Sequence, residues 1–176
     1  MGVFASARVH HVVLKGWHAW LAGSFLVAYV TADENTYAMH QFAGYAVLVA
    51  IVARLAGGLL APAGSPLRLP RADLEATRAW LSSRKGRHPL FAWFAVVLLA
   101  VVGFAALSGA VADSAAWMEH PHEAISEASL WVIFGHLAFV TWMYAGKKWV
   151  GRIASWFAGM RLSILPKENA PKENAQ

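Results

Sequence analysis

Apolar residues gather into four long runs that carry almost no charge. The runs cover about residues 12–31, 40–60, 89–112 and 124–146. A helix rises about 1.5 Å per residue, so about 20 apolar residues cross the hydrocarbon core of a bilayer, and each run is long enough to do so. The pattern therefore predicts an all-α membrane protein, a bundle of four transmembrane helices.

The charged residues around these runs are sorted by sign. Lysine and arginine lie before or at the start of the first run (Arg8 and Lys15), around the middle link of residues 61–88 (Arg54 to Arg87), or after the fourth run. The other two links, residues 32–39 and 113–123, hold acidic residues and no lysine or arginine. The positive-inside rule then predicts that both termini are cytoplasmic. A net charge of +5 that is sorted in this way favours a membrane over nucleic acid as the partner.

Composition supports the same class of protein. Of the 176 residues, 58% are hydrophobic and 14% are charged, whereas a soluble domain usually has about 25% charged residues. Four spans leave no room for a second folded domain, so we expect one transmembrane domain over residues 1–165. The start of the chain lacks a small-residue cleavage motif, which predicts a retained first helix and not a removed signal peptide.

Two segments outside the runs are also interpretable. Residues 71–83 in the middle link predict a short amphipathic helix that lies on lipid or, equally, a solvated connector. Residues 152–165 have a similar basic and aromatic character. Residues 166–176 repeat Pro-Lys-Glu-Asn-Ala and cannot bury a face, so we expect this tail to be disordered.

Cofactor chemistry is limited by the absence of cysteine. Without cysteine the chain has no disulfide, thiolate metal site, iron–sulfur cluster or C-x-x-C-H motif for covalent haem attachment. Any haem must be held by histidine or methionine. Ionisable groups within a membrane are costly and usually functional, which directs attention to the histidines.

Four histidines are predicted to form two pairs at two depths. His122 and His136 are fourteen residues apart on one run, which is about 21 Å along a helix and within roughly 40° of the same face. His40 opens the second run at the level of His122. His18 lies thirteen residues before the outer end of the first run, at the level of His136.

Two histidines at each level suit haem better than zinc. A zinc site needs about four ligands, whereas six-coordinate haem iron needs only two axial nitrogens. The alternative is a histidine that only makes packing hydrogen bonds, which is the more common role of a single membrane histidine. His120 competes with His122, but it lies two residues earlier on nearly the opposite face of the helix.

Several short stretches carry a family resemblance: residues 15–20, 40–55, 87–90 and 122–136. Through them the chain resembles the bacterial four-helix di-haem cytochrome b family, which includes the prokaryotic cytochrome b561 proteins and the b-type subunits of nickel–iron hydrogenases. The resemblance implies two non-covalent, bis-histidine haem b groups. His40 and His122 would bind the outer haem, and His18 and His136 the inner one. Ala19 separates His18 from Trp20, so His11 is an alternative first-helix ligand.

The resulting hypothesis is an electron conduit of the bacterial inner membrane. Two haems would relay electrons between a periplasmic redox partner and membrane quinone. The acidic outer links favour a basic cytochrome c or another basic redox subunit as partner, and a homodimer is compatible with so small a bundle. Arg54 would pair with an inner haem propionate, or serve only as an inner-side anchor.

Two other classes of function stay open. One is a stand-alone superoxide-to-quinone oxidoreductase, which would need an outer pocket that a small anion can reach. The acidic outer links would repel such an anion. The other is a non-redox membrane transporter or scaffold whose histidines move protons.

Overall fold

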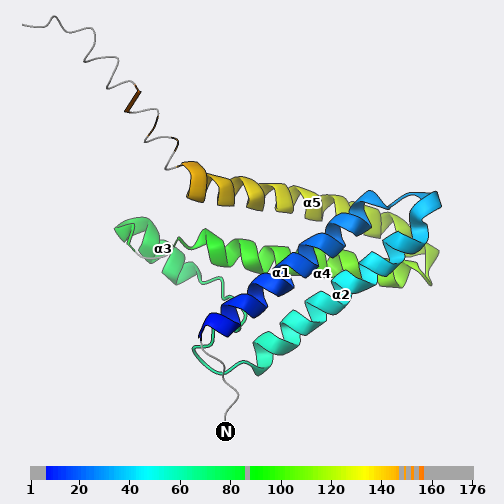
Figure 1. The fold of residues 1–176 in the computed structure, drawn as a ribbon, viewed down its shortest axis with the longest axis horizontal. Helices are drawn as coiled ribbons and strands as arrows, with labels where there is room; N and C mark the ends of the chain where they lie inside the picture. The colour runs from blue at the N-terminus through cyan, green and yellow to red at the C-terminus, as the bar shows by residue number, and fades with distance from the viewer. Residues whose placement is uncertain (1–6, 86–87, 147–148, 150–151, 153–154, 157–176) are drawn as a thin grey trace, which may run out of the picture. The chain divides into compact units, whose positions relative to one another are not determined.

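The computed structural model describes residues 7–85 and 88–146, together with residues 149, 152, 155 and 156. This part of the chain is helical and contains no strand (Figure 1). The helices are α1 (Ala7–Val30), η1 (Glu34–Thr36), α2 (Tyr37–Leu60), α3 (Leu74–Ser83), α4 (Leu90–Ala112), η2 (Ala116–Met118), α5 (Glu119–Thr141) and η3 (Trp142–Gly146). The chain divides into two compact units, Met1–Ile133 and Phe134–Gln176. The predicted disordered tail, residues 166–176, lies outside the described residues.

The all-helical class is confirmed, but the number of spanning helices is corrected. In the described part of the chain, three segments are long and apolar enough to cross a membrane: Glu34–Leu60, Leu90–Ala112 and Ala116–Gly146. The fourth expected span falls in α1, which has 24 residues and is therefore long enough. Lys15 and His18 interrupt its apolar pattern, and it is not among the three segments that are apolar enough to cross a membrane. The prediction of a bundle of four transmembrane helices is therefore wrong: the described part of the chain has five α-helices, and three segments qualify as spans.

The first unit has a small apolar core. In it α1 packs along α2, and α2 packs against α4. Val47 and Ile51 of α2 meet Val102 of α4, and partly buried side chains of α1 and α5 surround them. The indole Nε1 of Trp17 adds a cross-helix link, since it donates a hydrogen bond to the Ala50 carbonyl oxygen at 2.7 Å.

Most large apolar side chains face outward from the helices. Phe42 is 79% exposed, Leu60 is 85% exposed and Trp131 is 67% exposed. A soluble protein rarely exposes so much apolar surface. A bilayer accepts such side chains, and helices satisfy their own backbone hydrogen bonds there, so this surface is compatible with a membrane protein.

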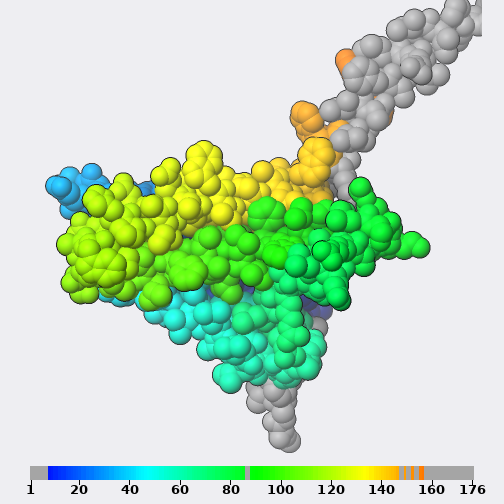
Figure 2. Space-filling model, turned by 180° about the vertical axis from the view of Figure 1, so that it is seen from behind, coloured from blue at the N-terminus to red at the C-terminus, as the bar shows by residue number. Residues whose placement is uncertain are grey.

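The middle link contains the expected short helix, which begins three residues later than predicted and ends where predicted, at Ser83. The Oδ1 of Asp73 accepts a hydrogen bond from the Glu75 backbone N–H at 2.8 Å and caps the first turn of α3. Arg84 ends the helix in a left-handed conformation, with φ 53°. The indole Nε1 of Trp93 donates to the Thr77 Oγ1 at 3.1 Å, which connects α3 to the first turn of α4. Figure 2 shows the side chains of α3 and the start of α4, in green, as a continuous surface.

The link is also fastened to the end of α2. The Arg54 guanidinium donates to the carbonyl oxygens of Leu67 at 2.6 Å and Arg68 at 3.3 Å. It also lies over the Trp17 ring, 5.7 Å from its centroid. Gly58, one turn later, is buried against the Leu69 side chain. Arg54 is therefore engaged by the chain itself, and these contacts add no support to its predicted pairing with a propionate.

Candidate functional site

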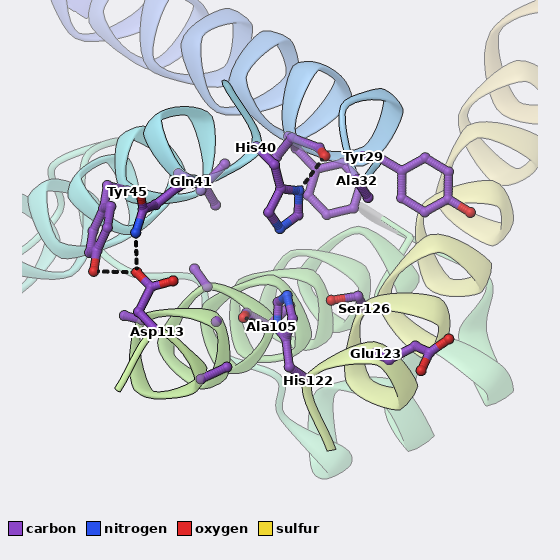
Figure 3. Close-up of a pocket in the computed structure, with 18 of the residues that line it drawn as sticks. Tyr29, Ala32, His40, Gln41, Tyr45, Ala105, Asp113, His122, Glu123 and Ser126 are labelled. Carbon is purple, nitrogen blue, oxygen red and sulfur yellow. Dashed lines mark hydrogen bonds between the residues drawn. The ribbon is translucent and has the colours of Figure 1, made fainter. Parts of the chain in front are cut away.

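His40 and His122 lie opposite one another in the first unit. His40 is in the first turn of α2, after η1, and His122 is in the first turn of α5, after η2. Their ring centroids are 6.1 Å apart and their planes make an angle of 67°. Figure 3 shows the two rings directed toward one another across a pocket. The structure thus brings together the two residues that helix geometry placed at one level, and their role as ligands stays a prediction.

The hydrogen bonds of these rings assign their tautomers. The Nδ1 of His40 lies 2.7 Å from the carbonyl oxygen of Ala28 in α1. The Nδ1 of His122 lies 3.0 Å from the carbonyl oxygen of Ala105 in α4. A carbonyl oxygen can only accept, so each Nδ1 carries the proton and each Nε2 keeps a lone pair. Histidines that bind metals usually have this arrangement, with the other ring N–H donated to a carbonyl or carboxylate.

The pocket between the two rings has the size of a cofactor site. Its volume is about 860 Å³, and residues of α1, α2, α4 and α5 line it. Cofactor and ligand pockets usually measure about 300–1,000 Å³. Small residues make up much of the lining, among them Ala28, Gly44 and Ala106. A Cβ added at Gly44, one turn after His40, would meet nothing within 4 Å, so open space lies beside the histidine.

The rim of the pocket is acidic. Asp113, Glu119, Glu123 and Glu127 line it, and no lysine or arginine is among the described lining residues. The pocket lining therefore carries the same negative charge that the sequence places in the two acidic links. The rim would attract a basic partner and repel a small anion.

One of these carboxylates joins α4 to α2. Asp113 accepts hydrogen bonds from the Tyr37 hydroxyl at 3.0 Å, the Gln41 Nε2 at 3.0 Å and the Tyr45 hydroxyl at 2.7 Å. We refer to these four residues as the Asp113 clamp; Figure 3 shows two of its bonds. The hydrogen bonds from Gln41 and then Tyr45 lower the pKa of Asp113 below its ordinary value, so the carboxylate stays charged.

Sequence reasoning missed the clamp. The sequence pattern places Asp113 only in an acidic link. A signal does exist, because Tyr37, Gln41 and Tyr45 recur every four residues and therefore share one face of a helix. That spacing indicates a polar stripe at the start of α2, although it does not identify the acceptor on α4.

The other candidate histidines have different surroundings. The His120 side chain is 96% exposed, with its Nδ1 4.0 Å from the Glu123 carboxylate, so it does not line the pocket. His18 and His11 are both exposed on α1. His136 is half-buried in α5, but it belongs to the second unit, whereas His18 belongs to the first. The pairing of His18 with His136 therefore stays a prediction.

His40 and His122 are the two histidines among the described residues that line this pocket. Among the residues that the structure describes, no three histidine, cysteine or acidic side chains gather as a metal-binding group. A four-ligand zinc site is thus not formed there.

Comparisons with protein-family models, with curated proteins and with solved structures give no match for this chain. The functional argument therefore depends on the geometry of the pocket.

Proposed function

We propose that this chain is a membrane di-haem cytochrome b, which relays electrons between a periplasmic redox partner and the quinone pool of the bacterial inner membrane. The observation that carries the proposal is the pair of His40 and His122 rings, which face each other across the pocket at 6.1 Å. Three helices long and apolar enough to cross a membrane support the membrane part.

The donor pair fits a haem iron. Two nitrogen–metal bonds of about 2 Å, with about 1 Å from each nitrogen to its ring centre, separate two ring centroids by about 6 Å. The separation in the pocket is 6.1 Å. Both Nε2 atoms are unprotonated by the tautomer argument, so neither ring has to lose a proton before it binds. If the two rings were stacked face to face, their Nε2 atoms would not point toward a shared iron. The interplanar angle of 67° excludes such stacking.

The residues then have distinct roles. His40 and His122 would hold the outer haem, and the carbonyls of Ala28 and Ala105 orient their rings. Bound haem supplies reversible one-electron chemistry at iron, with a potential set by axial ligands and burial. By the family resemblance, His18 and His136 would hold the inner haem.

The acidic rim favours a basic protein as the outer partner. Such a partner, for example a basic soluble cytochrome c, would be steered toward the rim at low ionic strength. Superoxide is an anion, and the described lining offers it no lysine or arginine. We therefore favour the conduit over the stand-alone superoxide-to-quinone oxidoreductase.

The proposal is tested by haem content in matched histidine variants. The purified protein should be red, with a reducible b-type spectrum and two haems per chain. His122→Ala and His40→Ala should each lose one haem. His120→Ala, two residues from His122 on the same helix, should keep both. A colourless folded protein, or equal haem content in the His120 and His122 variants, would contradict the proposal and leave a transporter or scaffold.

The partner is tested by kinetics. Quinol-reduced protein should reduce a basic cytochrome c at a rate that falls steeply as salt screens the rim. Reduction that responds to superoxide and is indifferent to salt and to cytochrome c would instead support the stand-alone enzyme.

A further inference from the structure

α4 contributes no histidine to the pocket, yet three of its residues surround the His122 ring. The carbonyl oxygen of Ala105 lies 3.0 Å from the His122 Nδ1, and the Ser108 Oγ lies 3.1 Å from the same atom. A Cβ added at Gly109 would come within 2.9 Å of the His122 Cε1. Positions 105, 108 and 109 lie on one face of a helix. We call these three residues the His122 seat.

The hydrogen bonds of the seat have one consistent assignment. The Ser108 hydroxyl donates to the Ala105 carbonyl oxygen at 3.0 Å. The His122 Nδ1 carries a proton because it faces the same carbonyl. Only a lone pair of the Ser108 oxygen can then face Nδ1, so the ring N–H is shared between two acceptors. Ser108 is buried, with 6% exposure. The contact with the His122 N–H gives its hydroxyl oxygen a hydrogen-bond donor within an otherwise apolar helix.

Gly109 provides the space for the ring. Its missing Cβ would lie 2.9 Å from Cε1 and 3.3 Å from both ring nitrogens, so the imidazole lies directly over this residue. Contacts below 3.0 Å do not occur for real Cβ atoms, so alanine here must displace the ring. At Gly103 of the same helix, an added Cβ would meet the Ile51 Cγ2 at 3.5 Å, an ordinary contact.

We infer that the His122 seat is a positioning device, in which Ala105 and Ser108 set the tautomer and donor strength of His122 while Gly109 sets the position of its ring. The effect on the His122 tautomer does not depend on a bound haem, whereas the effect on an iron rests on the proposed function. The Nδ1 of His40 faces one acceptor, the Ala28 carbonyl, whereas the Nδ1 of His122 faces two, so the two rings of one pocket differ in electron donation. Hydrogen bonding of the second ring nitrogen strengthens a histidine ligand.

Redox titration tests the role of Ser108. Ser108→Ala removes one acceptor of the His122 N–H and should raise the midpoint potential of one haem while leaving the other unchanged. Ser129→Ala is the matched control, because Ser129 is also buried and its hydroxyl also donates to the carbonyl three residues earlier, at 2.7 Å. Ser108→Thr keeps the hydroxyl and should have the midpoint potential of the wild type. Equal potentials in the Ser108→Ala and Ser129→Ala proteins would overturn the role of Ser108.

Haem content tests the role of Gly109. The clashing atoms belong to the end of the His122 side chain, so the fold should tolerate Gly109→Ala while the ring moves. We expect this variant to lose one haem per chain with a helical content like the wild type. Gly103→Ala should retain both haems. Full haem content with an unchanged spectrum in Gly109→Ala would overturn the role of Gly109.

A measurement without haem separates the two proposals. In haem-free protein with ¹⁵N-labelled histidine, the signal that His122→Gln removes should report the Nδ1–H tautomer. Ser108→Ala should increase the population of the Nε2–H form, and Ser129→Ala should not. A colourless wild type with these tautomer shifts would refute the haem proposal and leave the seat. If the protein is red but Ser108→Ala changes neither the His122 tautomer nor the midpoint potentials, the role of the His122 seat is refuted and the haem proposal is kept.

Discussion

Two adjacent glycines near the end of α2 give opposite expectations for the same substitution. A Cβ added at Gly58 would lie 2.6 Å from the Leu69 Cγ and 2.8 Å from the Arg54 Nη1. A Cβ added at Gly57 would meet nothing within 4 Å. Gly58→Ala should therefore push the middle link away from α2, whereas Gly57→Ala should leave the packing unchanged.

The size of the difference follows from terms that the two variants share. Replacing glycine by alanine within a helix gains about 0.5–1 kcal/mol in either position. Overpacking adds a cost of about 1–3 kcal/mol, at Gly58 alone. The free energy of unfolding should thus be about 1–3 kcal/mol lower for Gly58→Ala than for Gly57→Ala. The helix-propensity gain cancels in this comparison.

The steric clash also has a local consequence. The Arg54 Nη1 that alanine would displace donates the 2.6 Å hydrogen bond to the Leu67 carbonyl. When this bond is lost, the link around Arg68 should open more often. Trypsin should then cleave the link faster in Gly58→Ala than in the wild type.

Thermal unfolding in detergent, followed by circular dichroism, measures the first effect, and limited trypsinolysis measures the second. Gly57→Ala should melt at or above the temperature of the wild type, and Gly58→Ala should melt below the wild type. If both variants melt together and the link is cleaved at one rate, the link does not pack on α2 as described.

The remaining predictions concern contacts between helices of the first unit. Because the pKa of Asp113 is lowered in the folded protein, the stability it adds is present above its ordinary value, about 3.9, and is lost as the pH falls through the lowered value. Melting temperatures measured from pH 6 downward should therefore fall more for the wild type than for Asp113→Asn; parallel curves would exclude a contribution from the clamp. Trp17→Phe removes the donor to the Ala50 carbonyl and should cost about 0.5–1.5 kcal/mol in thermal unfolding. An unchanged melting temperature would show that this bond is energetically neutral.

The long helices could be predicted from hydropathy, with errors at their ends that have a physical cause. The fourth run was predicted to begin at residue 124, yet α5 begins at Glu119. Hydropathy marks where lipid-compatible side chains begin, whereas a helix can start among polar residues. The same limitation explains α1, which is helical over 24 residues although Lys15 and His18 interrupt its apolar pattern.

The pairing of His40 with His122 could also be predicted, because it needs only the rise of a helix and the order of the spans. The choice of His122 over His120 followed from helical spacing, and the exposure of His120 agrees with it. Side-chain hydrogen bonds between distant segments could not be predicted. Tyr45 and Asp113 are 68 residues apart in sequence, and nothing local to either residue identifies the other.

A single polar residue within an apolar helix can indicate a contact with a neighbouring helix. Ser108 is the only hydroxyl-bearing residue in α4. A buried hydroxyl can satisfy its own donor on the preceding turn, as Ser129 does, so a backbone bond alone would not require a neighbour. The Ser108 oxygen, however, also faces a ring nitrogen from another helix, and the next residue is the glycine that leaves space for that ring. In α4, a serine and the glycine that follows it together receive a side chain from α5, so a helix that has no histidine can still determine how a histidine of its neighbour is oriented.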